Sequence, residues 1–208
     1  MTLGVCGILF ALLTAVPLGV VAAIRPNSLI DRVALFLSVA GQAMPSFWFG
    51  LILIVVFAIQ LGLLPPSGAA TWRHFIMPTI VLGYYAMPAI MRLTRAGMLD
   101  VLGSDYIRTA RAKGAGETRV LFKHALRNAI IPVVSLAAVQ MGFMLGGSIV
   151  VESVFALHGA GYLAWESIAR NDLPTVQALI LVFSMFYIVF TFLADVLNAW
   201  LDPRMRSA

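Results

Sequence analysis

The stretch Asp105–Pro132, DYIRTARAKGAGETRVLFKHALRNAIIP, carries six of the chain's fourteen Lys and Arg residues and lies between two apolar runs. A short turn would join two membrane-spanning helices more simply than a cationic segment of this length. The segment has helical periodicity on both sides of Gly114-Ala115-Gly116, and glycines of this kind interrupt helices. We therefore expect two short helices that protrude together and contact a partner.

The composition identifies the class of protein. Hydrophobic residues make up 61% of the 208 positions and charged residues 11%, whereas charged residues make up about 25% of an ordinary soluble domain. The single cysteine, Cys6, lies in an apolar run and cannot form an internal disulfide. The chain is therefore expected to be a polytopic membrane protein without a soluble catalytic domain.

Apolar runs predict an all-α transmembrane bundle that forms one domain over residues 1–208, because a bilayer-spanning helix needs roughly 20 apolar residues. We expect a kink in the second helix at Pro45, which a membrane helix tolerates, and an end at the Leu64-Pro65-Pro66-Ser67-Gly68 turn. The third run is short and contains Pro78 and Pro88. We nevertheless count it as a span, because the cationic loop that follows it must lie on one side of the membrane. The expected spans cover about residues 3–24, 34–62, 75–92, 128–150 and 173–195.

The basic residues predict the orientation. With five spans, all Lys and Arg residues except Arg73 and Arg170 fall on one side of the membrane. The positive-inside rule makes that side cytoplasmic, so the C-terminus is expected inside and Met1 outside. No cleavable signal peptide explains an outer N-terminus. We therefore expect that an additional helix precedes Met1 in the natural protein.

The cytoplasmic loop, about residues 103–127, divides into two parts. Ser104 is a candidate N-cap for the first helix, Gly114 suits its C-terminal end, and Glu117 begins the second helix. Small residues beside Gly114 permit close approach of another protein, so docking is the preferred interpretation of Tyr106–Gly114. The second helix carries a basic stripe that either contacts anionic lipid or belongs to the docking surface. The stripe consists of Arg119, Lys123 and Arg127.

The segment DYIRTARAKGAGETRVLFKHALRNAIIPVV resembles the coupling loop of inner-membrane permeases from binding-protein-dependent ABC importers. It is most similar to the first permease of the dipeptide, oligopeptide, nickel and glutathione branch. Thr109-Ala110 and Gly114 match the family's EAA-three residues-Gly motif, while Arg108 replaces the Glu, as is typical of the peptide branch. Further matching segments, in family order, are AAIRPNSLIDR, MPSFWFGLILIVVFA, LGLLPPSG, MRLTRAGMLDVLGSDYIRTARAKG, GGSIVVESVFALHGAGYLAWESIARND and LDPRMR. Family members normally begin with a further helix and an outer region.

The resemblance implies a MetI-like permease of a bacterial or archaeal cytoplasmic membrane that performs no covalent chemistry. Its implied partners are a sister permease, two ATPase subunits that bind the ATP and Mg²⁺, and an extracytoplasmic binding protein. The chain would form half of a pathway for peptides or a related small solute, with no cofactor and no nucleic acid bound. The implied ATPase contacts are Tyr106, Thr109, Ala110, Arg111, Ala112, Lys113 and Gly114.

Polar and small residues at membrane depth are candidates for the translocation pathway, although such residues also pack helices together. Gln140 is the strongest candidate, because a buried amide in hydrocarbon needs a partner. The other candidates are Gly41, Gln42, Ser46, Gly142, Gly146, Gly147 and Ser148.

The remaining ionisable residues have two interpretations each. Asp195 in the last span is either a functional carboxylate or, as we prefer, an ion-pair partner of Arg204 or Arg206. The outer acids either contact a binding protein or belong to a solvated loop. These acids are Glu152, Glu166 and Asp172. The histidines are dispersed, so no metal site is expected; they are His74, His124 and His158.

Two other functional classes are compatible with a polytopic chain. An ion-gradient-driven transporter or channel would need buried charges along its path, and the spans are nearly free of acids. A membrane enzyme would need paired acids or clustered histidines at one interface. We therefore prefer an ATP-driven importer permease, and the chain contains no GxxxxGK[ST] nucleotide-binding loop of its own.

Overall fold

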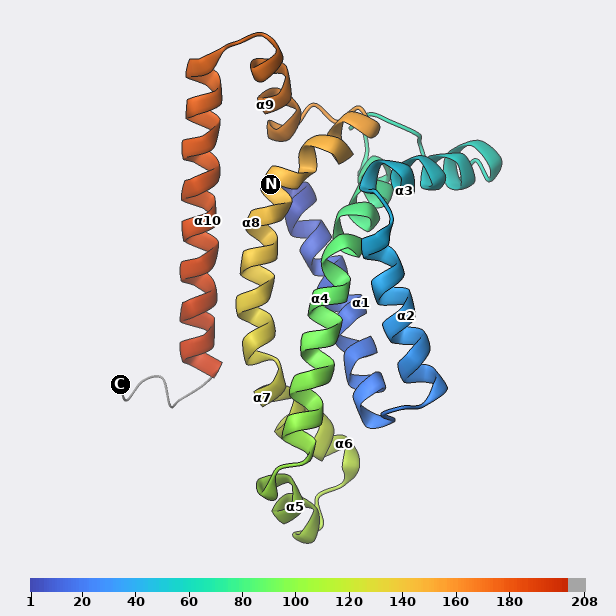
Figure 1. The fold of residues 1–208 in the computed structure, drawn as a ribbon, viewed down its shortest axis with the longest axis vertical. Helices are drawn as coiled ribbons and strands as arrows, with labels where there is room; N and C mark the ends of the chain where they lie inside the picture. The colour runs from blue at the N-terminus through green and yellow to red at the C-terminus, as the bar shows by residue number, and fades with distance from the viewer. Residues whose placement is uncertain (202–208) are drawn as a thin grey trace.

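The computed structural model describes residues 1–201, except for the side chains of residues 41, 42, 145–147 and 201. Every regular element in this part of the chain is helical, as expected for an all-α bundle. The longest helices run roughly along the long axis of the molecule (Figure 1). They are α1 (Thr2–Ile24), α2 (Leu29–Ala43), α4 (Ile76–Leu102), α8 (Ile131–Val154) and α10 (Leu173–Leu201).

The core of the bundle is the contact between α1 and α4. A Cβ atom added to Gly83 would lie 2.5 Å from the Gly7 carbonyl oxygen, and one added to Gly19 would lie 2.8 Å from the Met91 carbonyl oxygen. The two backbones therefore approach more closely than side chains would allow, as is usual where small residues line a membrane-helix interface. Ala15 on α1 is completely buried in this contact.

Among the described residues, three helices are long and apolar enough to cross a membrane, judged by length and composition: Thr2–Ile24, Trp72–Leu102 and Leu173–Trp200. A fourth span results if Glu117–Ala129 and Ile131–Met144, which meet at a bend of 50°, count as one broken span. The predicted helix at 75–92 is thus the start of a longer helix. Its Pro78 lies in the first turn of α4, where a missing N–H removes no intrahelical hydrogen bond.

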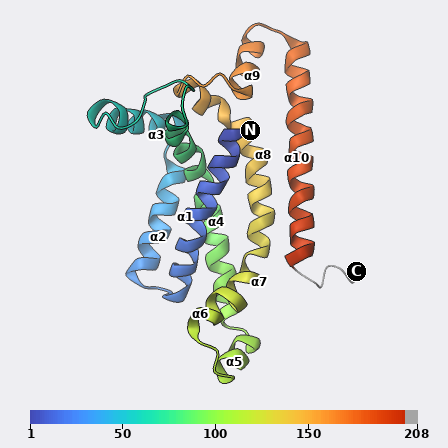
Figure 2. The same cartoon turned by 180° about the vertical axis from the view of Figure 1, so that it is seen from behind.

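The expected kink at Pro45 is wrong, because the helix ends there. Met44 (ψ 130°) and Pro45 (ψ 136°) both have extended backbones, and proline disfavours helical geometry in the residue before it. A new helix, α3 (Ser46–Leu53), continues into the π-helical segment η1 (Ile54–Gln60). Figure 2 shows this arm turned away from the direction of α2.

One end of the molecule carries the short 3₁₀ helix η2 (Trp72–Phe75) and helix α9 (Ala160–Ala169). The opposite end carries α5 (Asp105–Ala112), α6 (Glu117–Arg119), the π-helical segment η3 (Val120–Leu126) and α7 (Arg127–Ala129). Figure 1 shows α5 at the end of the molecule farthest from α9. The predicted coupling residues are therefore at one end of the bundle and the predicted binding-protein contacts at the other.

Candidate functional site

The loop at residues 103–127 forms the expected pair of helices joined at a glycine. Helix α5 ends at Ala112, Gly114 has a φ of 79°, and α6 begins at Glu117. This φ lies in the left-handed region that glycine adopts without steric strain. Ser104 is the N-cap residue of α5, as the sequence predicts, but its hydroxyl donates to the Val101 carbonyl and makes no capping hydrogen bond to the helix. We call the segment from α5 to α7 the elbow.

A small apolar cluster fixes the elbow to the bundle. Ile107 of α5 and Val120 of η3 are completely buried, and they pack with Met98 near the end of α4. Val20 and Ala23 of α1 belong to the same cluster. Because α4 leads directly into α5 and shares this cluster with it, the elbow is a packed extension of α4.

Tyr106 braces the two halves of the elbow. Its hydroxyl accepts a hydrogen bond from Asn128 Nδ2 at 2.7 Å and donates to the His124 carbonyl at 3.3 Å. The Tyr106 side chain nevertheless remains 43% exposed. The residue therefore has a structural role in addition to the surface role that the sequence predicts.

The other predicted coupling residues lie between the last turn of α5 and Gly114, and we call this segment, Thr109–Gly114, the tip of the elbow. Ala110 is half-buried and the remaining ones are exposed; these are Thr109, Arg111, Ala112, Lys113 and Gly114. A Cβ atom added to Gly114 would meet no atom within 4 Å. Six of the seven predicted residues are therefore accessible, and their contact with an ATPase remains a prediction.

Arg111 and Glu117 bridge the glycine turn from one helix to the other. Arg111 Nε donates to Glu117 Oε1 at 2.8 Å and Arg111 Nη2 donates to Oε2 at 3.2 Å. These hydrogen bonds lower the pKa of the Glu117 carboxyl and raise that of the Arg111 guanidinium. The sequence prediction overlooked Glu117 as a partner, because i,i+6 residues do not meet on a continuous helix.

We expect the Glu117→Gln variant to exchange the backbone amides of residues 111–117 faster than the wild type at neutral pH. The folded-state pKa of Glu117 is lowered, so its stabilising effect is present above the ordinary carboxyl pKa of about 4.3 and is lost as pH falls through the folded pKa. The difference between the two proteins should therefore disappear in strong acid. Hydrogen exchange of both proteins across this pH range measures it, and equal exchange at neutral pH would contradict the prediction.

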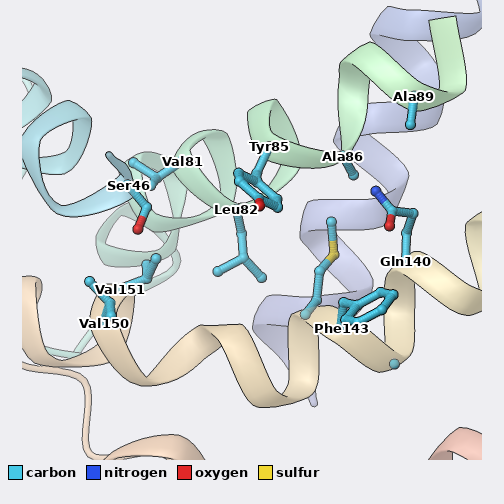
Figure 3. Close-up of a pocket in the computed structure, with 12 residues that line it drawn as sticks. Ser46, Val81, Leu82, Tyr85, Ala86, Ala89, Gln140, Phe143, Val150 and Val151 are labelled. Carbon is cyan, nitrogen blue, oxygen red and sulfur yellow. The ribbon is translucent and has the colours of Figure 1, made fainter. Parts of the chain in front are cut away.

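A cavity of about 720 Å³ opens beside α4 and α8 at the base of α3 (Figure 3). Gln140 extends from α8 towards α4 and Ser46 lies at the other end, so two pathway candidates share this space. None of the described residues that line it is charged. They are Ser46, Val81, Leu82, Tyr85, Ala86, Ala89, Gln140, Gly142, Phe143, Met144, Val150 and Val151.

Other pathway candidates are placed differently. Ser148 is buried on α8, where a Cβ atom on Gly161 would lie 2.8 Å from its hydroxyl oxygen. Gly142 lines the cavity and also packs against α10, since its added Cβ would overlap the Tyr187 ring. The candidates whose side-chain positions lie outside the described residues are Gly41, Gln42, Gly146 and Gly147.

Tyr85 and Phe143 line the cavity, and the sequence prediction did not include them. Tyr85 is 59% exposed and Phe143 is 69% exposed within this chain. Tyr85 lies in an apolar run, and its hydroxyl needs a polar partner or water. This requirement could have identified Tyr85 as a candidate from the sequence.

The sequence prediction also missed an ion pair at the end of the bundle that carries the elbow. Arg95 of α4 donates from Nε and Nη2 to the two carboxylate oxygens of Asp31, both at 2.6 Å, and Asp31 is only 2% exposed. The Asn27 amide donates to the same carboxylate at 2.9 Å. The pair therefore ties the α1–α2 turn and the start of α2 to the helix that leads into the elbow.

The three outer acids do not form one surface. Glu152 is 7% exposed and accepts a hydrogen bond from the Tyr162 amide at 2.7 Å, in the first turn of α9. The prediction that Glu152 is a surface contact is therefore wrong, since a carboxylate buried against a helix N-terminus is already satisfied. Glu166 pairs with Arg170 at 2.6 Å on the exposed side of α9.

Asp172 lies at the start of α10. It accepts hydrogen bonds from the hydroxyl and the amide of Thr175, which lower the pKa of its carboxyl. Asp195 is exposed, and its expected partners Arg204 and Arg206 lie outside the described residues. Within residues 1–201, no group of three His, Cys, Asp or Glu side chains is placed to hold a metal ion.

A helical bundle that carries a coupling-type elbow at one end and an uncharged cavity between its helices is the architecture of an importer permease. The family model described as "Binding-protein-dependent transport system inner membrane component" matches residues 15–207. The chain belongs to this family, and it is a membrane permease of an ATP-driven importer.

More particularly, the chain is 44% identical to glutathione transport system permease proteins GsiC over 204 residues. The relatives include those of Pectobacterium atrosepticum and Escherichia coli K12, and the match covers 98% of this chain and 67% of each relative. This places it in the dipeptide, oligopeptide and glutathione branch. The fold is also similar to a chain of the MetNI methionine ABC transporter in inward-facing crystal forms. The TM-score is 0.79 at 17% identity, covering 97% of this chain and 92% of the other.

Proposed function

We propose that this permease forms half of a translocation pathway for peptides or a related small solute such as glutathione. The related GsiC proteins are named as glutathione permeases, and the branch supports solutes of this kind. The cavity beside α4 and α8 is open on one side and contains neutral hydrogen-bonding groups on Gln140, Ser46 and Tyr85. A second, sister permease would close it.

Two separate ATPase subunits would supply the energy, because this chain carries no P-loop sequence. The observation that carries this proposal is the elbow, whose exposed tip is mounted on α4 through the buried Ile107 and Val120. A force applied at the tip would therefore move α4, which lines the cavity through Val81 and Tyr85. Tyr106–Gly114 would be the surface that an ATPase subunit contacts.

The orientation follows from charge. The elbow and the exposed Arg25, Arg32 and Arg92 would face the cytoplasm, and so would the C-terminus. Helix α9, with Glu166 on its exposed side, would then face an extracytoplasmic binding protein. The importer would be assembled in a bacterial or archaeal cytoplasmic membrane.

Cysteine cross-linking within the assembled importer tests the arrangement. Cys6 is the chain's only cysteine, so a Cys6→Ala background allows single cysteines to be placed at Ala112, on the elbow tip, and at Ala69, on the exposed outer loop. We expect Ala112→Cys to cross-link to an ATPase subunit and Ala69→Cys not to do so. Cross-linking of the ATPase from Ala69→Cys alone would refute both the orientation and the docking surface.

A further inference from the structure

The second half of the elbow is a helix set at an angle to the span that follows it. Glu117–Ala129 bends by 50° from Ile131–Met144. Three of its residues are buried against α4 and α5 and fix how the helix is rotated; these are Val120, Ala125 and Ala129. The side chains on its outward surface therefore have a defined direction.

That outward surface combines cations with an aromatic ring. Arg119, Lys123 and Arg127 are exposed, and Phe122 between them is 61% exposed. A merely solvated helix face does not require a large apolar ring among its charges. Amphipathic helices that lie at a membrane surface combine Lys and Arg with exposed Phe, Trp or Leu in this manner.

The acids of the elbow neutralise other cations. Asp105 pairs with Arg108 at 3.3 Å and Glu117 pairs with Arg111 at 2.8 Å. The ion pairs among the described residues involve Arg95, Arg108, Arg111 and Arg170, so the three cations of the outward surface keep their charge uncompensated. Lys113 also keeps its charge, so three of the elbow's four cations without an ion pair among the described residues lie on its second half.

The position of this surface matches the depth of lipid headgroups. Arg127 precedes the first residue of α8, Ile131, by four residues, which is about 6 Å along a helix. A side chain so close to the start of a membrane span lies at the headgroup level. Phosphate groups of the inner leaflet are the anions available at this depth.

We propose that Arg119, Phe122, Lys123 and Arg127 form a binding surface for anionic phospholipid. The three cations bind the headgroup phosphates, and the Phe122 ring inserts among the upper parts of the acyl chains. The elbow is thereby held at a fixed height below the bilayer, while its tip remains free. This surface is distinct from Tyr106–Gly114 and does not depend on the proposed ATPase contact.

Titration of the purified full chain with phosphatidylglycerol in neutral detergent, followed by native mass spectrometry, tests the proposal. The variant R119Q/K123Q/R127Q is compared with R25Q/R32Q/R92Q, which removes the same charge from three other exposed arginines. We expect affinity to fall by about five-fold for each stripe cation removed, and to fall much less in the control variant, whose three arginines lie at the end of α1, on α2 and on α4 and do not form one stripe. Equal losses in the two variants would overturn the proposal, because net charge alone would then account for binding.

Two further experiments distinguish phospholipid from free phosphate and from an ATPase subunit as the ligand of this surface. Phe122→Ala should weaken phosphatidylglycerol binding, and inorganic phosphate should not compete for the site; competition by phosphate would overturn the lipid assignment. In the assembled importer, the stripe variant should still co-purify with the ATPase subunits. Retained lipid binding together with lost ATPase co-purification would show that the stripe is part of the ATPase contact, and the proposal would be wrong.

Discussion

Replacing Asp31 by Asn is expected to lower the free energy of unfolding by about 3 kcal/mol. Asp31 is 2% exposed and holds Arg95 through two hydrogen bonds of 2.6 Å. Removing one partner of a buried ion pair leaves the other charge uncompensated, which typically costs about 3–5 kcal/mol. The lower figure applies because the Arg95 side chain is 21% exposed and water reaches part of it.

Chain unfolding in detergent, followed by circular dichroism, measures this loss. Asp100→Asn is the matched control, since Asp100 is an exposed carboxylate on α4, the helix that carries Arg95. The double variant D31L/R95M should recover most of the stability, because an apolar pair replaces both charges. If Asp31→Asn unfolds at the same denaturant concentration as Asp100→Asn, the ion pair does not stabilise the fold.

Replacing Gly114 by Trp is expected to reduce transport by about 5- to 150-fold, the range of a typical coupling free energy between two sites. Gly114 has a φ of 79° and its position is open to solvent. The indole would therefore project into the ATPase subunit that is proposed to contact the elbow tip. Because an added Cβ atom meets no other atom within 4 Å, membrane insertion and protein level should remain normal.

Two control variants separate the bulk of the indole from backbone strain at Gly114. Gly114→Ala introduces the strain of a positive φ, about 1–2 kcal/mol, without the ring. Gly116→Trp introduces the ring at a φ of −64°, where no strain arises. Uptake by the reconstituted importer is the measurement, with basal ATP hydrolysis recorded alongside. Normal uptake by Gly114→Trp would exclude Tyr106–Gly114 as the coupling surface.

The elbow could be predicted from the sequence because its signals are local. Gly114 marks the end of α5 and Glu117 the start of α6, and both follow from backbone preferences within a few residues. The break at Pro45 is a different case. A membrane helix can keep a proline as a kink if neighbouring groups satisfy the freed carbonyl, so a single sequence does not distinguish a kink from an end.

The other differences between the sequence predictions and the structure arise from contacts between residues far apart in the sequence. Asp31 and Arg95 are 64 residues apart, and only the packing of α2 on α4 brings them together. Glu152 looks like a surface acid, but the fold places the N-terminus of α9 over it, where Gly159 and Gly161 leave no room for a Cβ atom. Gln140 and Ser46, which line the cavity, could be predicted because polar side chains at membrane depth are rare. Tyr85 lines the same cavity but was not predicted, because most of its side chain is an apolar ring.

Helix α10 has a consequence for how the protein is made. None of the most apolar window of Leu173–Trp200 is buried by the rest of the chain, and its mean hydropathy is 2.3. Such a helix satisfies its own backbone and can enter the bilayer without waiting for the other helices. Its contacts with α8, Asn198 to Ser135 and Tyr187 over Gly142, then fix only its rotation. We therefore expect α10 to be the last helix to dock during biogenesis.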